Sequence, residues 1–281
     1  MKAGAKASTT TGASPVAPDE IARAFVEARL EARALPGYPG DIPATLAEGY
    51  AVQELAIGLY PDEIVGWKVG RIPPHLQGPL GQERLAGPTF RRFLQAPAEG
   101  ETVVLSAITG GFAAVEAEFI YRLRIDAPED KTDWTPAEAL DVVAALHIGV
   151  EFAGSPLKTI NDLGSTVVAS DFGNNAALIV GPEIPGWRDR ADETLPCETW
   201  VEGVLVGSGT AASIPDGPAA ALAFLLGHCA ARGRPLKAGL YVTTGAATGI
   251  HDIVAGQSAR VSFGEFGDIL CVAEEARPAA R

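Results

Sequence analysis

The chain has 281 residues, of which 47% are hydrophobic and 20% charged, so it can form one or two globular domains with a substantial core. Its 22 basic and 35 acidic residues give a formal charge of −13, and a polyanion is a poor partner for nucleic acid or an anionic membrane. The 3 cysteines match neither a disulfide framework nor a zinc site, and no apolar run is long enough to span a bilayer. We therefore expect a soluble, cytoplasmic protein that binds neither nucleic acid nor membrane.

The N-terminal part of the chain predicts a tail followed by helices. Residues 1–17 are mostly small and polar, which indicates a disordered tail. Apolar residues at helical spacing predict one helix over residues 18–35 and a second that begins near Asp41. We thus divide the rest of the chain into a helical N-terminal region, 18–62, and a catalytic region, 63–281.

Strands dominate the predicted catalytic region. Residues 78–100 are rich in Gly, Pro and Arg and predict a long surface loop, a candidate flap over a site. Two helices are expected, over Pro136–Leu146 behind a Thr135 capping box and over Pro218–Ala231. The predicted strands are 64–70, 101–105, 112–123, 147–153, 176–180, 199–206, 240–244, 259–263 and 268–272. So many short strands favour an α+β fold with a mixed or antiparallel sheet closed on itself over a βαβ repeat.

The strand Phe112–Leu123 carries two carboxylates on one face. Its apolar residues fall on odd positions, whereas Glu116 and Glu118 fall on even ones, as expected for a strand with one face in a core. The two side chains point the same way about 7 Å apart and would repel each other unless a positive charge lay between them. A divalent cation is one candidate, and a solvated acidic face is the alternative. Ala114 and Ile120 share this face, which favours an enclosed position for the carboxylates.

Two other charged residues lie inside predicted strands. Lys68 follows Trp67 and has a glycine two positions away on each side, so a ligand or a second backbone can approach it closely. The alternative is a lysine whose ammonium reaches solvent at the strand end. Glu151 shares a face with Gly149 and Ala153, which leaves room beside its carboxylate; the alternative is an exposed strand glutamate.

Several stretches together resemble the 2-keto-4-pentenoate hydratase family of the fumarylacetoacetate hydrolase superfamily. They are Tyr50-Ala51-Val52-Gln53, Gly66-Trp67-Lys68-Val69-Gly70, Val115-Glu116-Ala117-Glu118, Glu151, Arg234-Pro235-Leu236-Lys237-Ala238-Gly239 and Thr244-Gly245-Ala246. The resemblance extends over nearly the whole chain after the N-terminal tail, and it rests on the order and spacing of these stretches together. The resemblance implies a mixed β-roll or sandwich of the fumarylacetoacetate hydrolase type and a homo-oligomer.

The resemblance also implies a set of site residues. Glu116, Glu118 and Glu151 would hold Mg²⁺ or Mn²⁺, and Lys68 would reach into the site. The substrate-binding residues would be Lys68, Asp171, Asn174, Thr244 and Gly245. The family's Asp-Ser-Arg run after the third glutamate is absent here, because Phe152-Ala153-Gly154-Ser155-Pro156 follows Glu151. An arginine that would meet a second substrate charge is therefore missing from this segment, and the substrate need not be the family's usual one.

The chemistry expected of such a site is that of a 2-oxo acid enolate. Three carboxylates suit a hard cation with oxygen ligands, and a 2-oxo acid can bind it through its carboxylate and keto oxygens. We expect a hydratase that adds water to a 2-hydroxy-2,4-dienoate or 2-oxo-enoate to give a 4-hydroxy-2-oxo acid. The alternatives are a decarboxylase of a 2-oxo-enedioate, an acylpyruvate-type C–C hydrolase and a catalytically silent binding protein. The hydrolase is less favoured because no H-x-x-E pair lies between Lys68 and Glu116.

Overall fold

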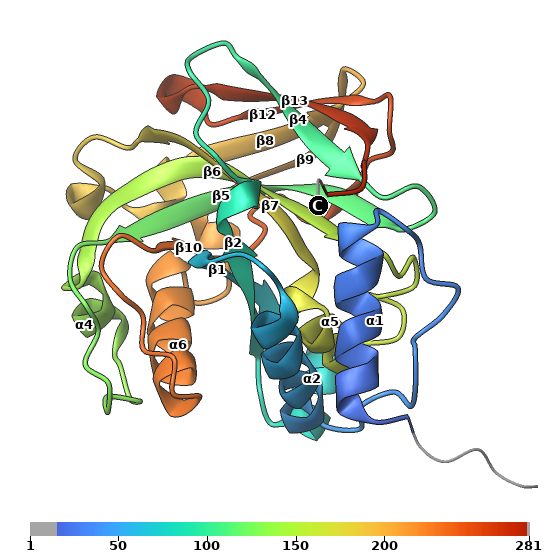
Figure 1. The fold of residues 1–281 in the computed structure, drawn as a ribbon. Helices are drawn as coiled ribbons and strands as arrows, with labels where there is room; N and C mark the ends of the chain where they lie inside the picture. The colour runs from blue at the N-terminus through green and yellow to red at the C-terminus, as the bar shows by residue number, and fades with distance from the viewer. Residues whose placement is uncertain (1–15, 280–281) are drawn as a thin grey trace, which may run out of the picture.

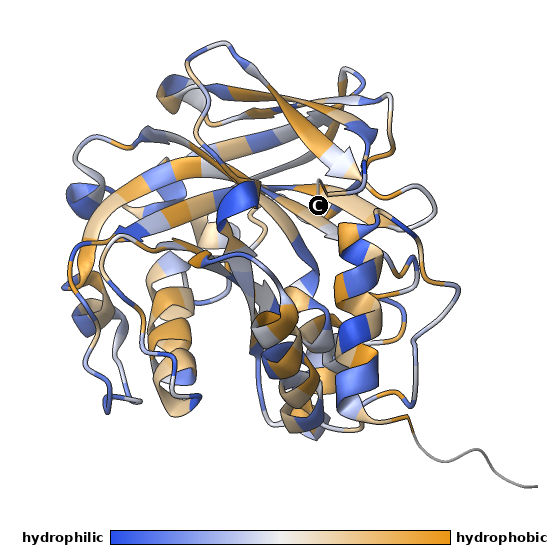
Figure 2. Ribbon diagram, in the orientation of Figure 1, coloured by the Kyte–Doolittle hydropathy of each residue, from blue (hydrophilic) through white to orange (hydrophobic). Residues whose placement is uncertain are grey.

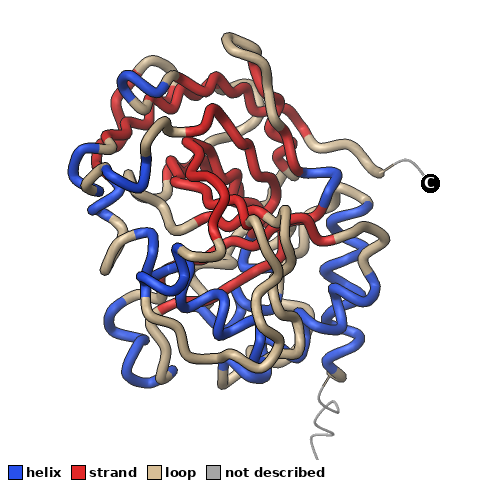
Figure 3. The backbone as a smooth tube through the Cα atoms, turned by 90° about the vertical axis from the view of Figure 1, so that its left-hand side faces the viewer, coloured by secondary structure: helices blue, strands red, loops and turns tan. Residues whose placement is uncertain are grey.

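A computed structural model describes residues 16–279, which form two β-sheets and a group of helices (Figure 1). In Figure 1 the smaller sheet lies above the larger one, and most of the helices lie below it. The view in Figure 3, turned by 90°, shows the strands gathered above most of the helices. The predicted α+β class is confirmed, and the predicted tail lies almost wholly outside the described residues.

The larger sheet has 8 strands, with β11 paired to β5 and the others in the order β2-β1-β10-β5-β6-β7-β3. Its strands are β1 (Ile64–Arg71), β2 (Arg84–Phe90), β3 (Leu94–Gln95), β5 (Phe112–Leu123), β6 (Val143–Ser155), β7 (Asn175–Glu183), β10 (Tyr241–Thr243) and β11 (His251–Asp252). The central strand β5 is buried on both faces along most of its length and pairs antiparallel with β6 from end to end. Any polar side chain at the middle of β5 is therefore removed from solvent.

The smaller sheet has 5 strands in the order β4-β13-β12-β8-β9. They are β4 (Thr102–Ala107), β8 (Pro196–Val201), β9 (Val204–Thr210), β12 (Ser258–Ser262) and β13 (Asp268–Glu275). The predicted single strand 199–206 is wrong, because it is a hairpin whose turn, Glu202-Gly203, has positive φ at both residues. Apolar residues on both sides of this turn made the two strands look continuous.

The helices are α1 (Pro18–Leu30), α2 (Leu46–Leu59), α3 (Pro74–Leu80), α4 (Pro136–Leu140), α5 (Ser165–Ser170) and α6 (Pro218–Ala231). Figure 2 shows hydrophobic residues along the strands of the larger sheet and along α6. A single hydrophobic cluster runs from Phe25 on α1 through Phe119 on β5 to Val261 on β12, so the N-terminal helices share the core of both sheets. No helix in the described range, 16–279, is both long and apolar enough to cross a membrane.

Two predicted helices are shorter than expected. The first ends at Leu30, since Ala32 already has a positive φ and Leu35 bridges to Leu157. The helix predicted over Pro136–Leu146 has the expected capping box but ends at Leu140, and β6 begins at Val143. In both cases tertiary contacts and strand pairing override a local pattern that is compatible with a helix.

The predicted surface loop over residues 78–100 is wrong. Its middle is β2, which pairs antiparallel with β1 and is buried from Leu85 to Phe90. Gly87 lies so close to the turn after α5 that a Cβ atom there would lie 1.8 Å from the Phe172 carbonyl oxygen. The Gly and Pro content that predicted a loop instead permits this close backbone approach.

Candidate active site

The three glutamates predicted as metal ligands converge in the interior. Glu116 on β5 is paired directly with Glu151 on β6, and Glu118 lies two residues further along β5. One carboxylate oxygen from each lies within 4.8 Å of the other two. The exposed fractions are 3% for Glu116 and 0% for Glu118 and Glu151, so the alternative of a solvated acidic face is excluded.

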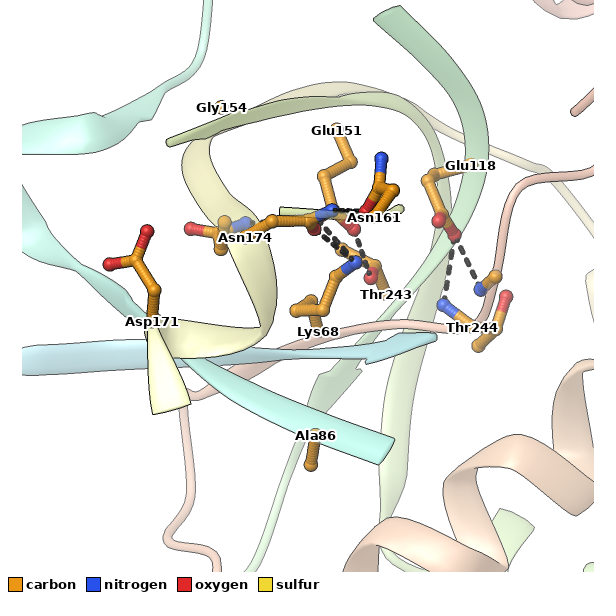
Figure 4. A network of polar contacts seen from close by, with 12 residues as sticks. Lys68, Ala86, Glu118, Glu151, Gly154, Asn161, Asp171, Asn174, Thr243 and Thr244 are labelled. Atoms are coloured by element: carbon orange, nitrogen blue, oxygen red, sulfur yellow. Dashed lines mark hydrogen bonds and ion pairs between the residues drawn. The ribbon is translucent and has the colours of Figure 1, made fainter. Parts of the chain in front are cut away.

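Neighbouring polar groups orient two of these carboxylates (Figure 4). The backbone N–H groups of Thr244 and Gly245 donate to Glu118 Oε2, at 3.0 and 2.8 Å. The Thr243 hydroxyl donates to Glu151 Oε2 at 3.1 Å, and the Asn175 amide donates to Glu151 Oε1 at 3.3 Å. These contacts fix the carboxylates without neutralising their charge.

The remaining carboxylate oxygens fit a divalent cation. Glu116 Oε1 and Glu118 Oε1 are buried and accept no hydrogen bond from any residue in the described range. Burial, opposed by Lys68, raises the pKa of Glu116 to about 8, and burial together with Glu151 and Glu116 raises the pKa of Glu118 well above its usual range. Buried, unpaired carboxylate oxygens are costly, and a hard cation with oxygen ligands is the group that would satisfy them.

Lys68 lies beside this cluster, on β1. Its Nζ is 3.1 Å from Glu151 Oε1, and the residue is 4% exposed. It also donates to Asn174 Oδ1 at 3.1 Å, and the Asn174 amide in turn donates to Asn161 Oδ1 at 3.1 Å. Burial alone would lower the pKa of Lys68, but the Glu151 and Glu116 carboxylates raise it above its ordinary value. The alternative of a lysine whose ammonium reaches solvent is therefore excluded.

Asp171 does not join this group. Its carboxylate is fully buried and accepts hydrogen bonds from Arg29 of α1, at 2.6 and 2.9 Å, and from the Ser155 hydroxyl at 2.6 Å. In Figure 4 the Asp171 side chain points away from Glu151 and Lys68. The structure therefore places Asp171 as an anchor that ties α1 to the segment carrying Asn174.

A cavity of about 540 Å³ opens onto the cluster. Among the predicted site residues, Lys68, Glu116, Asn174, Thr244 and Gly245 line it. Further lining residues come from the end of β1, the start of β2, the loop before α6, the segment from Asn161 to α5 and the residue before β11; they include Arg71, Arg84, Ile214, Asn161, Ser165 and Ile250. The cavity therefore leads to Lys68 and to Glu116, the member of the carboxylate cluster that lines it.

Three residues of the site were not predicted in these roles: Asn161, Asn175 and Thr243. Asn161 and Asn175 belong to a segment dense in small polar residues, a composition equally typical of turns. Thr243 lies in an apolar strand, where a threonine is an ordinary residue. Only the pairing of β10 with β5 and of β6 with β7 brings Thr243 and Asn175 to Glu151, whereas Asn161 joins the site through its hydrogen bond with Asn174.

Comparison with known proteins connects this geometry to solved structures. No protein-family model and no curated protein matches the chain. It superposes on 4-oxalocrotonate decarboxylase from Pseudomonas putida G7, complexed with magnesium and adipate, with a TM-score of 0.75 and 20% identity over 91% of this chain and 97% of that one. The same enzyme complexed with calcium and acetate gives the same TM-score, 0.75, with 96% of that chain covered. The chain has the fumarylacetoacetate hydrolase fold.

A second enzyme with this fold is more distant. Fumarylpyruvate hydrolase from Pseudomonas aeruginosa, in complex with Mn²⁺ and pyruvate, matches with a TM-score of 0.53 and 14% identity over 74% of this chain and 88% of that one. The predicted architecture is thus confirmed, including its helical N-terminal region. At these identities the likeness establishes the fold alone, so the reaction has to be argued from the site.

Proposed function

We propose that this protein is a divalent-metal-dependent hydratase that adds water to a 2-hydroxy-2,4-dienoate or 2-oxo-enoate to give a 4-hydroxy-2-oxo acid. One observation carries the proposal: three buried carboxylates, two of them with an oxygen that accepts no hydrogen bond from the described residues, converge beside Lys68 where the cavity reaches the interior. Hard oxygen ligands favour Mg²⁺ or Mn²⁺. The magnesium, calcium and manganese in related structures of this fold support the same class of ion.

The cation and the side chains would have different roles in the reaction. A bound Mg²⁺ or Mn²⁺ supplies Lewis acidity toward the carboxylate and keto oxygens of a 2-oxo acid. Glu116, Glu118 and Glu151 are the residues that would hold it. Lys68 places a cationic donor where negative charge develops on the keto oxygen as the enolate forms, and such preorganised donors are worth several kcal/mol in a dry site. Asn174 keeps the Lys68 ammonium in place.

The reaction balances without a redox partner. The dienol hydroxyl proton is transferred to the terminal carbon, which gives the conjugated 2-oxo-enoate. The water oxygen then bonds to C4, and a proton is added at C3 as the enolate returns to the ketone. Lys68 is the only lysine among the cavity-lining residues in the described part of the chain, so we assign its ammonium as the proton donor to carbon, and the dienol hydroxyl proton then restores the ammonium.

Decarboxylation of a 2-oxo-enedioate is the second candidate. It is favoured by the similarity to 4-oxalocrotonate decarboxylase, which covers more of this chain than the match to the hydrolase. The same enolate would receive the electron pair of the bond that breaks as CO₂ leaves. A C–C hydrolase is less supported, because no histidine of the described residues lines the cavity to activate water.

An assay with defined substrates tests the proposal. Purified protein with Mg²⁺ or Mn²⁺ is mixed with 2-hydroxypenta-2,4-dienoate, and separately with 2-oxohex-3-enedioate. Loss of the dienoate absorbance without CO₂ release supports the hydratase, whereas CO₂ release from the enedioate would replace it with the decarboxylase. Turnover of neither acid would contradict the proposal and favour the catalytically silent binding protein.

A further inference from the structure

Gly70 on β1 lacks a side chain at a position where the fold does not require a glycine. It follows Lys68 by two residues, so both residues face the same side of the strand. Its φ lies outside the left-handed region, and a Cβ atom added to it would have no described atom closer than 3.4 Å. By contrast, a Cβ atom at Gly66 on the same strand would lie 2.8 Å from the Tyr241 carbonyl oxygen. Neither backbone conformation nor packing therefore accounts for Gly70, although a glycine weakens a strand.

The missing side chain leaves room beside the Lys68 ammonium. The point that a Cβ atom of Gly70 would occupy lies 3.5 Å from Lys68 Nζ and 3.4 Å from Leu85 Cδ1. Gly70 and Leu85 are paired directly across β1 and β2, and all three residues line the cavity. A ligand that reaches Lys68 can therefore extend over Gly70 in contact with Leu85.

Ile214 provides a second apolar wall close to the carboxylates. A Cβ atom at Gly245 would lie 3.7 Å from Ile214 Cγ2, and the Gly245 N–H donates to Glu118 Oε2. Ile214 and Leu85 are each 3% exposed, although both line the cavity. Their side chains therefore offer a carbon chain an enclosed apolar surface beside the polar groups of the site.

The strands beside this space offer no partner for a second carboxylate. On β1 and β2, both described in full, Lys68 is the one charged residue on this face, because Arg71 and Arg84 are paired on the opposite face. Arg84 is moreover bound to Asp216. Glu83 and Asp216 also line the cavity, and their carboxylates would repel a second anionic group of the substrate.

We propose that Gly70, Leu85 and Ile214 form an apolar subsite for the carbon chain of the substrate beyond its keto group. This inference rests on the proposed function, and it assigns the substrate to 2-oxo acids with one carboxylate and a hydrocarbon end. The cavity of about 540 Å³ lies within the range of about 300–1,000 Å³ that is typical of drug-sized ligands, so it has room for such an end. An acid of this kind has no distal carboxylate to lose as CO₂, so the subsite favours hydration over decarboxylation.

Binding of unreactive 2-oxo acids tests the subsite without turnover. Protein loaded with Mg²⁺ is titrated by calorimetry with pyruvate, 2-oxohexanoate and 2-oxohexanedioate. We expect 2-oxohexanoate to bind about tenfold more tightly than pyruvate, because its longer chain buries additional apolar surface. It should also bind at least as tightly as the diacid, which differs from it by the distal carboxylate.

Gly70→Ala fills the proposed room beside Lys68. This variant should bind 2-oxohexanoate about tenfold more weakly and pyruvate within about twofold of the wild-type affinity. Adding Leu85→Val, which removes the δ-methyl groups of Leu85, should restore part of the affinity for 2-oxohexanoate. Gly58→Ala on the exposed side of α2 is the matched control, because no atom lies within 4 Å of its new Cβ. Mg²⁺ titration and thermal unfolding of each variant establish that the carboxylate cluster and the fold are intact.

The outcomes separate the subsite from the proposed function. Equal binding of pyruvate and 2-oxohexanoate, tighter binding of the diacid, or an unchanged affinity for 2-oxohexanoate in Gly70→Ala would each overturn the subsite, while the proposed function stands. If none of the three acids binds the Mg²⁺-loaded protein, the proposed function fails and the subsite with it.

Discussion

Lys68 Nζ lies 3.1 Å from Glu151 Oε1, and both residues are withdrawn from solvent. This ion pair joins β1 to β6, two strands that are not neighbours in the sheet. It supplies the positive charge closest to three carboxylates that would otherwise face one another in the interior. The same ion pair therefore contributes to the stability of the metal-free protein and holds a residue that the proposed reaction uses.

Replacing Lys68 by Met should separate these two roles. Removing one partner of a buried ion pair costs about 3–5 kcal/mol, because it leaves the other charge unpaired. We expect Lys68→Met to unfold at a lower temperature without metal and to gain more from added Mg²⁺ than the wild-type protein. Turnover should fall by about 100-fold or more. Thermal unfolding with and without Mg²⁺ and steady-state kinetics measure both effects, and wild-type turnover in this variant would remove Lys68 from the mechanism.

Glu118→Gln should weaken metal binding and turnover together. The substitution keeps an oxygen that can accept from Thr244 and Gly245 but removes the charge of a ligand whose other oxygen has no partner among residues 16–279. Calorimetric Mn²⁺ titration and kinetics on the same preparation check the two losses. Glu274→Gln is the matched control, because Glu274 is an exposed glutamate on β13. Unchanged Mn²⁺ affinity in Glu118→Gln would contradict the assignment of this ligand.

Gly87→Ala should disturb the site through the backbone. The added Cβ would lie 1.8 Å from the Phe172 oxygen, so β2 and the turn Phe172–Asn174 must move apart. Overpacking of this kind costs about 1–3 kcal/mol, and the movement would withdraw Asn174 from Lys68. Chemical denaturation and kinetics measure the effect. Gly78→Ala in the exposed helix α3 has no atom within 4 Å of the new Cβ and should change stability by at most about 1 kcal/mol.

His228 on α6 should make folding sensitive to acid. Burial and the nearby Arg232 lower its pKa from 6.5 to about 4. Between these two values the unfolded chain binds more protons than the folded one, so the free energy of unfolding should fall as the pH falls from 6.5 to about 4. The slope from this residue is at most about 1.4 kcal/mol per pH unit.

Denaturant unfolding across this range tests the effect. His228→Phe keeps the stacking on Phe224 and removes the titrating group, so its stability should depend less on pH than that of the wild-type protein. His75→Phe is the control, because His75 is exposed on α3 and does not touch this stack. An identical pH dependence in wild type and His228→Phe would contradict the assignment.

The sequence was informative about the fold where burial produces a regular pattern. The strand Phe112–Leu123 and the limits of α6 at Pro218 and Ala231 were predictable from the spacing of their apolar residues, although β5 is buried on both faces and not on the one that its alternation predicts. The strand Arg84–Phe90 was missed, because its Gly and Pro residues serve a close backbone contact that is visible only once η2, Phe172–Asn174, is in place. The end of α4 was missed because the apolar residues that were expected to continue this helix belong instead to the start of β6.

Of the site, only the charged residues that lie inside strands could be identified from the sequence. The strand pattern singled out Glu116, Glu118, Glu151 and Lys68 as charged residues that need partners if buried, and the family resemblance, not the pattern, implied that they form one site. The role of Asp171 as the partner of Arg29 was not predictable, since the two residues are 142 positions apart and nothing local marks the pair.

The cluster of three glutamates is the central claim, and a crystal of the protein grown with Mn²⁺ and oxalate tests it most directly. Anomalous diffraction at the manganese edge should show one Mn²⁺ ion among the carboxylates of Glu116, Glu118 and Glu151. Two oxygens of the oxalate, which take the places of the carboxylate and keto oxygens of a 2-oxo acid, should then bind the Mn²⁺ ion from the side of the cavity. An absence of anomalous signal at this position at saturating Mn²⁺, or an ion bound elsewhere with these carboxylates apart, would contradict the claim.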